Sequence, residues 1–244
     1  MKVVLVSLAI GEKYLNIYNI LFRKSHEDYA KLHGYDFKVI TDFLDTNYTS
    51  NKSITFHKFL LCNQEWSNDY DFIIYVDADI LINIKSPSIH DFIDYEGLIG
   101  VVDEYTQPTK EARLKIQQKM NWEVTAKEYY KLCDFDIDTE MVLNGGMFVM
   151  QPKLHNNFLL NIYDKYVAQS STHFRDFHWE QSCFGYELQK NNYYKVLDNK
   201  FNAVWWMEKI DNPYNNLQTY FNNNYFIHFA GHVDYDKIQF LNKS

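Results

Sequence analysis

Two aspartates, Asp77 and Asp79, directly follow an apolar run and are the strongest candidates for chemistry in this chain. The run, residues 72–76, is rich in β-branched and aromatic side chains and predicts a short strand buried on both faces. Side chains two residues apart in an extended segment point to the same side, so both carboxylates can reach one ion. Hard oxygen ligands suit Mg²⁺ or Mn²⁺ that substrate phosphates also hold. The alternative is that the two acids only cap a turn, but apolar residues resume at once at 80–82.

The elements that must position these acids alternate between strand-like and helix-like patterns, as in βαβ units with a mostly parallel sheet. Strands are predicted at residues 3–8, 35–40, 72–76, 97–102 and 147–150. Helices are predicted at residues 14–32, 54–66, 110–120, 154–167 and 179–189, with the charged helix at 110–120 expected to be exposed. Ligands of open α/β sheets bind beyond the carboxyl ends of the strands, which is where both aspartates are expected.

The composition predicts one globular domain over residues 1–244, with 46% hydrophobic and 18% aromatic residues. A net charge of −8 and the lack of a basic run argue against a nucleic-acid partner. The sequence contains neither a membrane-spanning stretch nor a signal peptide, which predicts a cytoplasmic protein, or one in the host cytoplasm if the source is a virus. Cys62, Cys133 and Cys183 are widely spaced and are expected to be free thiols.

Several common ligand motifs are missing. The first strand-to-helix turn, residues 7–14, has neither the glycine pattern of dinucleotide-binding proteins nor that of P-loops, which disfavours NAD, FAD and P-loop hydrolysis. The acidic segment 134–140 lacks the glycine and the distal glutamate of a calcium-binding loop and is predicted to be solvated.

Three later motifs carry further candidates. Residues 225–231 predict a strand that ends near His228 and Gly231; from the residues alone this histidine is more readily structural than a ligand, and His232 is a nearby alternative. Asn144 and two glycines precede a strand, where glycines permit close approach of a ligand or simply form a tight turn or bulge. Glu180 opens a helix, a position that the helix dipole favours for any acid.

In order and spacing these motifs resemble the GT-A glycosyltransferases, especially family 8, with glycogenin and the lipopolysaccharide galactosyltransferases, and the galactosyl- and xylosyltransferases of family 34. Small glycosyltransferases of large DNA viruses are also similar. The resemblance covers most of the chain. It implies an α/β fold, a single Rossmann-like GT-A domain with a mixed, mostly parallel sheet flanked by helices. Residues 1–103 would then bind the nucleotide sugar, and residues 104–244 the acceptor.

The resemblance also implies roles for single residues. Asp77, Asp79 and His228 would hold Mn²⁺ or Mg²⁺ against the diphosphate of a nucleotide sugar, with UDP the expected carrier. Gln181 and Glu180 would face the reacting carbon of the sugar in a retaining reaction. Sequence leaves open the inverting alternative, which needs a carboxylate base that Glu180 could supply.

Other residues would contact the donor by the same resemblance. The main chain near the first strand would line the nucleobase, a lysine upstream of the acids would contact the donor, and Asn144 with its neighbouring glycine would lie near the donor sugar or the acceptor. Family 8 places a lysine on the diphosphate where this chain has Asp234, so Lys237 substitutes for it or the phosphate is neutralised differently. The full expected donor set is Ser7, Ala9, Ile10, Lys58, Asp77, Ala78, Asp79, Asn144, Gly145, Gly231 and Lys237.

The resemblance therefore implies metal-dependent transfer of a sugar to a hydroxyl of a glycan or glycoprotein acceptor. The aromatic segment 201–206 is a candidate acceptor platform, with one of its two tryptophans expected in the core. Two alternatives remain at this point: a catalytically silent GT-A module that binds a glycan or a protein, and a metal-dependent nucleotidyltransferase that uses the same acids.

Overall fold

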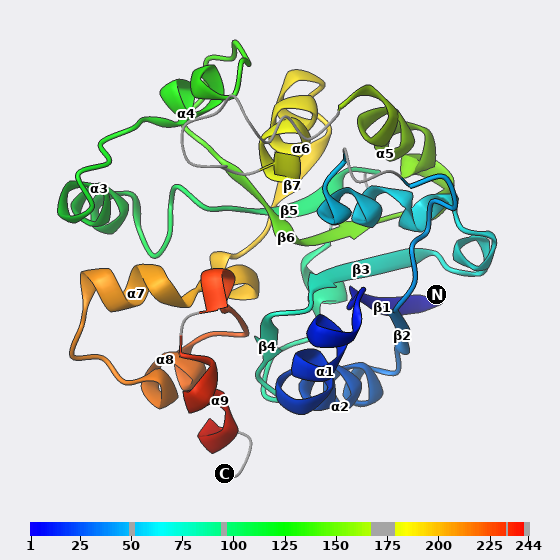
Figure 1. Ribbon diagram of the computed structural model, residues 1–244, viewed down its shortest axis with the longest axis horizontal. Helices are drawn as coiled ribbons and strands as arrows, with labels where there is room; N and C mark the ends of the chain where they lie inside the picture. The colour runs from blue at the N-terminus through cyan, green and yellow to red at the C-terminus, as the bar shows by residue number, and fades with distance from the viewer. Residues whose placement is uncertain (49–51, 94–96, 167–178, 233, 242–244) are drawn as a thin grey trace.

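The computed structural model describes residues 1–48, 52–93, 97–166, 179–232 and 234–241, without the side chains of Trp179 and His232. Its centre is a six-stranded sheet in the order β2-β1-β3-β6-β5-β7 (Figure 1). These strands are β1 (Val3–Leu8), β2 (Asp36–Ile40), β3 (Phe72–Asp77), β5 (Ile99–Asp103), β6 (Leu143–Met150) and β7 (Tyr194–Val196). Among them β6 runs antiparallel to both neighbours, whereas the β2–β1, β1–β3 and β5–β7 pairs are parallel. The predicted mixed, mostly parallel sheet is confirmed.

A second sheet brings the end of the chain to the acids. It has the order β4-β9-β8 and consists of β4 (Ile80–Ile82), β9 (Phe226–His228) and β8 (Ala203–Val204). β4 begins immediately after Asp79 and pairs antiparallel with β9, so that Ile80 lies opposite His228. Because β4 and β3 are joined by the short turn that carries the aspartates, this pairing fixes His228 beside them.

Helices cover both faces of the large sheet (Figure 1). On one face lie α1 (Glu12–Leu21) and α2 (Arg23–His33), and on the other η1 (Ile54–Asn63), α5 (Pro152–Lys165) and α6 (Trp179–Lys190). Side chains alternate along each strand, so Val6 and Tyr75 pack on the η1 side, while Leu5 and Ile74 pack with Tyr29 on the α2 side. Both faces of β1 and β3 are thus buried, as their continuous apolar sequence predicts.

The remaining elements are η2 (Glu65–Asp69), η3 (Ile89–Phe92), α3 (Lys110–Lys119), α4 (Ala126–Leu132), η4 (Asn199–Asn202), α7 (Trp205–Asp211), α8 (Leu217–Asn223), η5 (Ala230–His232) and α9 (Tyr235–Leu241). Several differ from expectation. The helix predicted at 14–32 is broken at Phe22, whose carbonyl accepts a hydrogen bond from the Ser25 hydroxyl at 2.7 Å. The predicted helix at 54–66 is two 3₁₀ segments. α3 is only partly exposed, since Arg113 and Ile116 are buried near α7.

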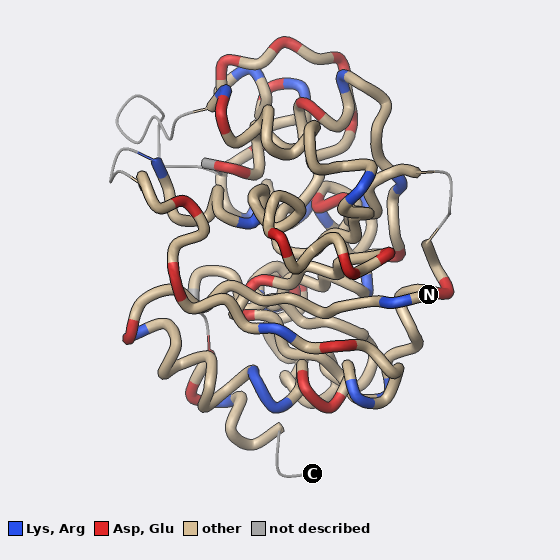
Figure 2. Tube along the Cα trace, turned by 90° about the vertical axis from the view of Figure 1, so that its right-hand side faces the viewer, with Lys and Arg blue, Asp and Glu red and all other residues tan. Residues whose placement is uncertain are grey.

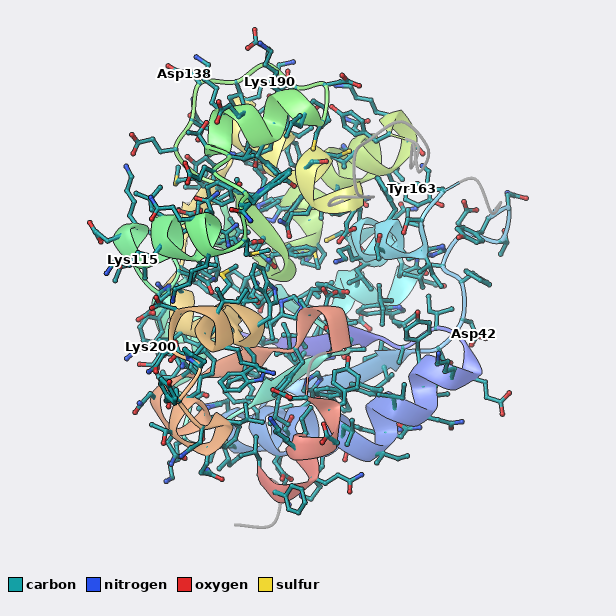
Figure 3. The ribbon with its side chains drawn as sticks, turned by 60° about the vertical axis from the view of Figure 1, so that its left-hand side comes forward. Asp42, Lys115, Asp138, Tyr163, Lys190 and Lys200 are labelled. Carbon is teal, nitrogen blue, oxygen red and sulfur yellow. The ribbon has the colours of Figure 1, made fainter. Side chains whose placement is uncertain are left out.

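Charged residues of both signs are interspersed along the described chain, without a long basic stretch (Figure 2). The acidic segment 134–140 is a loop at the outer edge, where Asp138 projects outward and pairs with Lys127 at 3.0 Å (Figure 3). The three cysteines are free thiols, as predicted. Among the described residues, no helix combines the length and the apolar character of a membrane span.

Candidate active site

Asp77 and Asp79 lie where β3 leaves the sheet and β4 begins, each with about a quarter of its side chain exposed. Asp77 accepts hydrogen bonds from the Tyr75 hydroxyl and from Lys58 Nζ, the latter at 3.1 Å. The turn that carries the two aspartates is held on both sides by main-chain hydrogen bonds, because β3 before it pairs with β1 and β4 after it pairs with β9. The acids are therefore fixed at the carboxyl end of a central strand, as predicted.

His228 ends β9 and faces both aspartates. Its Nε2 lies 3.3 Å from Asp79 Oδ1 and 3.9 Å from Asp77 Oδ2, and the three side chains offer ligand atoms that all lie within 4.8 Å of one another. Its other ring nitrogen, Nδ1, lies 2.9 Å from Asn202 Oδ1. The structure thus brings together the three residues predicted as metal ligands. The side chain of His232, the alternative, lies outside the described part of the chain.

The charges of this cluster favour a bound proton or cation. Burial alone would lower the pKa of His228, but Asp79 and Asp77 outweigh it and raise the pKa above 6.5. Burial raises the pKa of Asp77, Lys58 opposes that effect, and the net direction is upward because Asp79 is also near. Two carboxylates and an imidazole that hold a proton this way can exchange it for a metal ion.

Lys58, from η1, joins the group formed by Asp77, Asp79 and His228 to the start of α6. Its side chain is 1% exposed, and its Nζ donates to Asp77 Oδ1 at 3.1 Å, Glu180 Oε1 at 2.9 Å and the Gly145 carbonyl at 3.0 Å. Burial would lower the pKa of Lys58, yet Asp77 and Glu180 hold it above its usual value. Burial would raise the pKa of Glu180, and Lys58 instead holds it below its usual value. Lys58 was predicted to contact the donor, and here its ammonium meets these three protein oxygens.

Gln181, the next residue of α6, is 8% exposed. Its Nε2 donates to Glu104 Oε2 at 3.0 Å, and its Oε1 lies 3.4 Å from the Gly145 nitrogen. Glu104 follows β5, is 5% exposed and also accepts from Asn144 Nδ2 at 2.9 Å. Sequence analysis missed Glu104, because it lies in a polar stretch that is typical of a surface turn.

The two glycines of β6 have different surroundings. Pairing between β5 and β6 skips from Phe148 to Asn144, so Gly145 and Gly146 lie in a bulge inside the strand, where a start at residue 147 was predicted. A Cβ on Gly146 would meet His228 Cε1 at 2.5 Å, whereas one on Gly145 would meet nothing closer than Glu180 Oε1 at 3.7 Å. Gly146 is thus the glycine that lets the histidine approach, and the position predicted for Gly145, near the donor sugar or the acceptor, stays a prediction.

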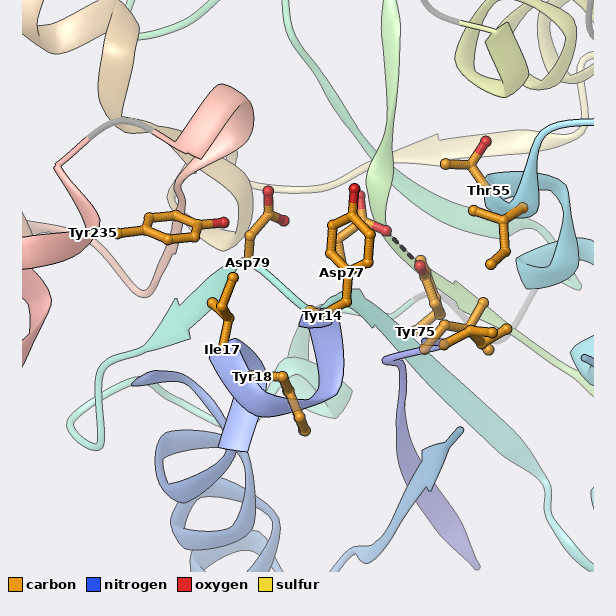
Figure 4. Close-up of a pocket in the computed structure, with 12 residues that line it drawn as sticks. Tyr14, Ile17, Tyr18, Thr55, Tyr75, Asp77, Asp79 and Tyr235 are labelled. Carbon is orange, nitrogen blue, oxygen red and sulfur yellow. Dashed lines mark hydrogen bonds between the residues drawn. The ribbon is translucent and has the colours of Figure 1, made fainter. Parts of the chain in front are cut away.

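A cavity of about 260 Å³ opens beside the aspartates (Figure 4). Of the residues predicted for the nucleotide, Ile10 and Ala78 line it, whereas Ser7 and Ala9 are buried beneath, with Ser7 Oγ donating to the Val76 carbonyl at 2.9 Å. Tyr14 of α1 and Tyr235 of α9, which the sequence analysis did not select, come from opposite sides of the opening. The lining residues are Leu8, Ile10, Tyr14, Ile17, Tyr18, Ile54, Thr55, Tyr75, Asp77, Ala78, Asp79 and Tyr235.

Lys237 and Gly231 do not line this cavity. Gly231 has φ of 77° and open space where a Cβ would stand, and Lys237 Nζ lies 3.0 Å from Asp234. Burial would raise the pKa of Asp234, but hydrogen bonds from Lys209, Trp205 and Lys237 lower it to about 2. The predicted diphosphate lysine is thus paired with the acid that occupies the family's lysine position.

In the aromatic segment 201–206, Trp205 is 2% exposed and donates from Nε1 to Asp234 Oδ2 at 2.8 Å, so it is the tryptophan that belongs to the core. Trp206 is only partly buried and lies over the guanidinium of Arg113. Its ring remains the candidate acceptor platform.

No protein-family profile and no curated protein sequence matches the chain. Solved structures do. A glycosyltransferase involved in glycosylation of the major capsid of PBCV-1 aligns with a TM-score of 0.61 and 14% identity, over 98% of this chain and 97% of that one. The bifunctional glycosyltransferase WbbM, in its apo form, aligns with 0.60 and 14%, over 95% of this chain and 46% of that one. The galactosyltransferase LgtC, solved with donor and acceptor sugar analogues, aligns with 0.53 and 13%, over 99% and 95%. At these identities the likeness shows the fold, and the predicted GT-A fold is confirmed.

Proposed function

We propose that this protein is a metal-dependent glycosyltransferase. It would move a sugar from a nucleotide diphosphate sugar, with UDP the expected carrier, to a hydroxyl of a glycan or glycoprotein. The observation that carries the proposal is that Asp77, Asp79 and His228 come together from two sheets beside a cavity. The chain also shares its fold with three solved glycosyltransferases.

The donor set fits Mn²⁺ or Mg²⁺. Two carboxylates and one imidazole, all able to approach one point, are ligands that these ions accept, and the remaining positions suit diphosphate oxygens. When bound, such an ion would offset the negative charge that grows on the departing diphosphate. Asp77, Asp79 and His228 are the residues that would hold it.

The cavity offers a place for the nucleoside. Ile10 and Ile17 give it an apolar wall, and Tyr14, which is 55% exposed, also lines it. A flat aromatic face of this kind can stack on a nucleobase. Figure 4 shows the Tyr235 hydroxyl pointing towards Asp79 across the opening, where it could donate to the diphosphate. A nucleoside held there would place its phosphates beside the proposed metal ligands.

The reacting face would be formed by Glu180 and Gln181. An inverting enzyme needs a carboxylate base whose pKa lies near the working pH. Lys58 holds the pKa of Glu180 below its usual value, despite burial, so Glu180 is a weak base. Its fixed negative charge suits orientation of the donor's hydroxyls, and the neutral carbonyl oxygen of Gln181 suits stabilisation of an oxocarbenium-like centre. This arrangement favours retention.

The first experiment measures UDP release from a panel of UDP-sugars, with Mn²⁺ and with a chelator. We expect slow, metal-dependent release that an acceptor accelerates, and no release by Asp79→Asn, a variant that removes one ligand charge without changing size. Pyrophosphate release would instead indicate a nucleotidyltransferase. Glycan binding without any release would indicate a silent GT-A module. NMR of the fresh product then gives the stereochemistry: an anomeric configuration opposite to the donor's would refute retention.

A further inference from the structure

Glu104 is the common end of two hydrogen-bonded branches that lead to the two halves of the site. Its Oε2 accepts from Asn144 Nδ2 at 2.9 Å and from Gln181 Nε2 at 3.0 Å, while its Oε1 lies 3.5 Å from the guanidinium of Arg113. Arg113 is 6% exposed and always charged, so it supplies the positive charge that a buried carboxylate needs. An ionised carboxylate can only accept hydrogen bonds, and both amides must therefore turn their NH₂ groups towards it.

The first branch ends at His228. With its NH₂ on Glu104, Asn144 presents its oxygen to the other side, where it accepts from Asn202 Nδ2 and from the Gly146 N–H, each at 2.7 Å. The Gly146 N–H is a donor by necessity and so independently fixes the same orientation. Asn202 then presents its own oxygen to His228 Nδ1 at 2.9 Å. Asn202 Oδ1 cannot donate, so its contact with Nδ1 requires a proton on that nitrogen. Asp79 Oδ1, 3.3 Å from Nε2, competes for a proton on the other side of the ring. When the ring carries one proton, the shorter contact with Asn202 favours Nδ1 and leaves the lone pair of Nε2 for a cation.

The second branch ends at Gln181. Its NH₂ group is turned to Glu104, so its carbonyl oxygen lies on the side of the Gly145 N–H, 3.4 Å away. The carbonyl of the same glycine accepts a hydrogen bond from Lys58. Reversal of this amide would place a positive NH₂ edge where the proposed reaction develops positive charge. The orientation of one amide therefore decides whether the group helps or opposes that reaction.

We propose that Glu104 is a positioning residue that sets the polarity of both branches, directing an unprotonated His228 Nε2 to the metal side and the Gln181 carbonyl oxygen to the reacting face. This inference rests on the proposed function for its catalytic consequence. The hydrogen-bond polarity itself is a property of the chain alone and can be measured without metal or donor.

Two substitutions separate polarity from packing. Glu104→Gln keeps the size but adds an NH₂ group, which must meet either the Arg113 guanidinium or the two amide NH₂ groups, whichever way it turns. The charge of Arg113 favours the new side chain's oxygen on the Arg113 side, so its NH₂ group faces the amides of Asn144 and Gln181. Glu104→Asp is shorter but can still only accept, and it is the matched control.

The test is ¹⁵N NMR of the ring nitrogens in metal-free, histidine-labelled protein, at a pH where the imidazole is neutral. The His228 signals are identified by their loss in His228→Asn. We expect a protonated Nδ1 and an unprotonated Nε2 in the wild type and in Glu104→Asp, and a population with protonated Nε2 in Glu104→Gln. We also expect kcat of Glu104→Gln to fall about 10- to 100-fold with little change in donor KM, and Glu104→Asp to keep more of it.

Several results would overturn the inference. A wild-type His228 protonated at Nε2 would do so even if both variants failed to fold. If Glu104→Gln kept the His228 tautomer and kcat of the wild type, Glu104 would have a packing role only. The same would follow if Glu104→Gln and Glu104→Asp lost equal amounts of kcat. If the wild type releases no UDP from any donor, the proposed function fails while the tautomer still decides the first branch. The second branch is then read from the Gln181 side-chain amide protons, which should be protected from exchange in the wild type and Glu104→Asp but not in Glu104→Gln.

Discussion

Alanine at Gly146 should damage the metal site, whereas alanine at the neighbouring Gly145 should not. Both glycines lie in the β6 bulge, so the two changes have the same chemistry and nearly the same place in the fold. At Gly146 the new methyl group would lie 2.5 Å from His228 Cε1 and 2.9 Å from its Nδ1. At Gly145 it would lie 3.7 Å from Glu180 Oε1, an ordinary contact. At Gly146 the methyl group would also lie 2.9 Å from Asn144 Oδ1, so the pair tests the approach of the histidine ring together with the Asn144 side chain.

The size of the effect follows from what the ring can do to escape. Ordinary contact begins near 3.4 Å, so the ring must move by about 0.9 Å. Asn202 holds its Nδ1 at 2.9 Å, and strand pairing to Ile80 and Val204 holds its backbone. Overpacking of this kind costs about 1–3 kcal/mol. Displacement of a proposed ligand by nearly an ångström should weaken metal affinity at least as much as loss of an outer partner does, about 10- to 100-fold.

Calorimetric titration of Mn²⁺ in the presence of UDP measures the affinity, and thermal unfolding of the metal-free proteins measures the cost to the fold. For a chain of this length 1 kcal/mol corresponds to about 2–4 °C in Tm. We expect Gly146→Ala to lose both affinity and Tm, and Gly145→Ala to keep both. Wild-type Mn²⁺ affinity in Gly146→Ala would refute the assignment of His228 as a ligand. Equal losses in the two variants would show that the bulge tolerates no side chain at all.

Three further predictions concern charge and chemistry. Burial would lower the pKa of His228, but Asp79 outweighs burial and raises the pKa above 6.5. Because the ligand must lose its proton, Mn²⁺ affinity should fall about tenfold for each pH unit below that pKa. Titration of Mn²⁺ at several pH values checks this, and an affinity independent of pH contradicts it. Lys58→Met removes the buried cation that Asp77 and Glu180 share and should cost about 3 kcal/mol in metal-free unfolding, which added Mn²⁺ should partly restore; an unchanged Tm would show that these buried ion pairs add no stability. Gln181→Ala should lower kcat far more than it raises donor KM, and steady-state kinetics showing the reverse would assign it to binding.

Much of the large sheet can be predicted from local sequence, because short runs of β-branched residues between polar turns are typical of strands. β1 occupies residues 3–8 as predicted, and β3 extends its prediction by one residue, to Asp77. The break at Phe22 could not be predicted, since apolar periodicity continues through it. Its cause is tertiary: the Ser25 hydroxyl bonds both the Phe22 carbonyl and the Ile82 N–H, 57 residues away, at 2.7 and 3.1 Å. The apolar spacing of a helix cannot indicate a hydrogen bond from a residue as distant in the sequence as Ile82.

The site divides in the same way. Asp77 and Asp79 could be selected because they follow an apolar strand, where a polar group needs a reason to be buried. His228 could be selected only through the resemblance to the GT-A glycosyltransferases, because a lone histidine in that position is more readily structural. Glu104 and Asn202 could not be selected from the sequence. Glu104 lies in a polar stretch that is typical of a loop, and Asn202 is a single polar residue in the aromatic segment 201–206. Glu104 is buried only because α3, α6 and the β6 bulge meet over it, and that convergence exists in space and not in sequence.

Shared partners connect the proposed metal ligands and the proposed reacting face into one unit. Lys58 places a single buried cation between Asp77, a proposed metal ligand, and Glu180, at 3.1 and 2.9 Å. If a metal ion binds Asp77, the attraction between Asp77 and Lys58 weakens, and the ion pair between Lys58 and Glu180 changes with it. Residues that share one partner in a buried network do not contribute additively. If the proposed function holds, the charge of Glu180, and with it the orientation of a donor sugar, is therefore coupled to occupancy of the proposed metal site through a lysine that need touch neither the ion nor the sugar.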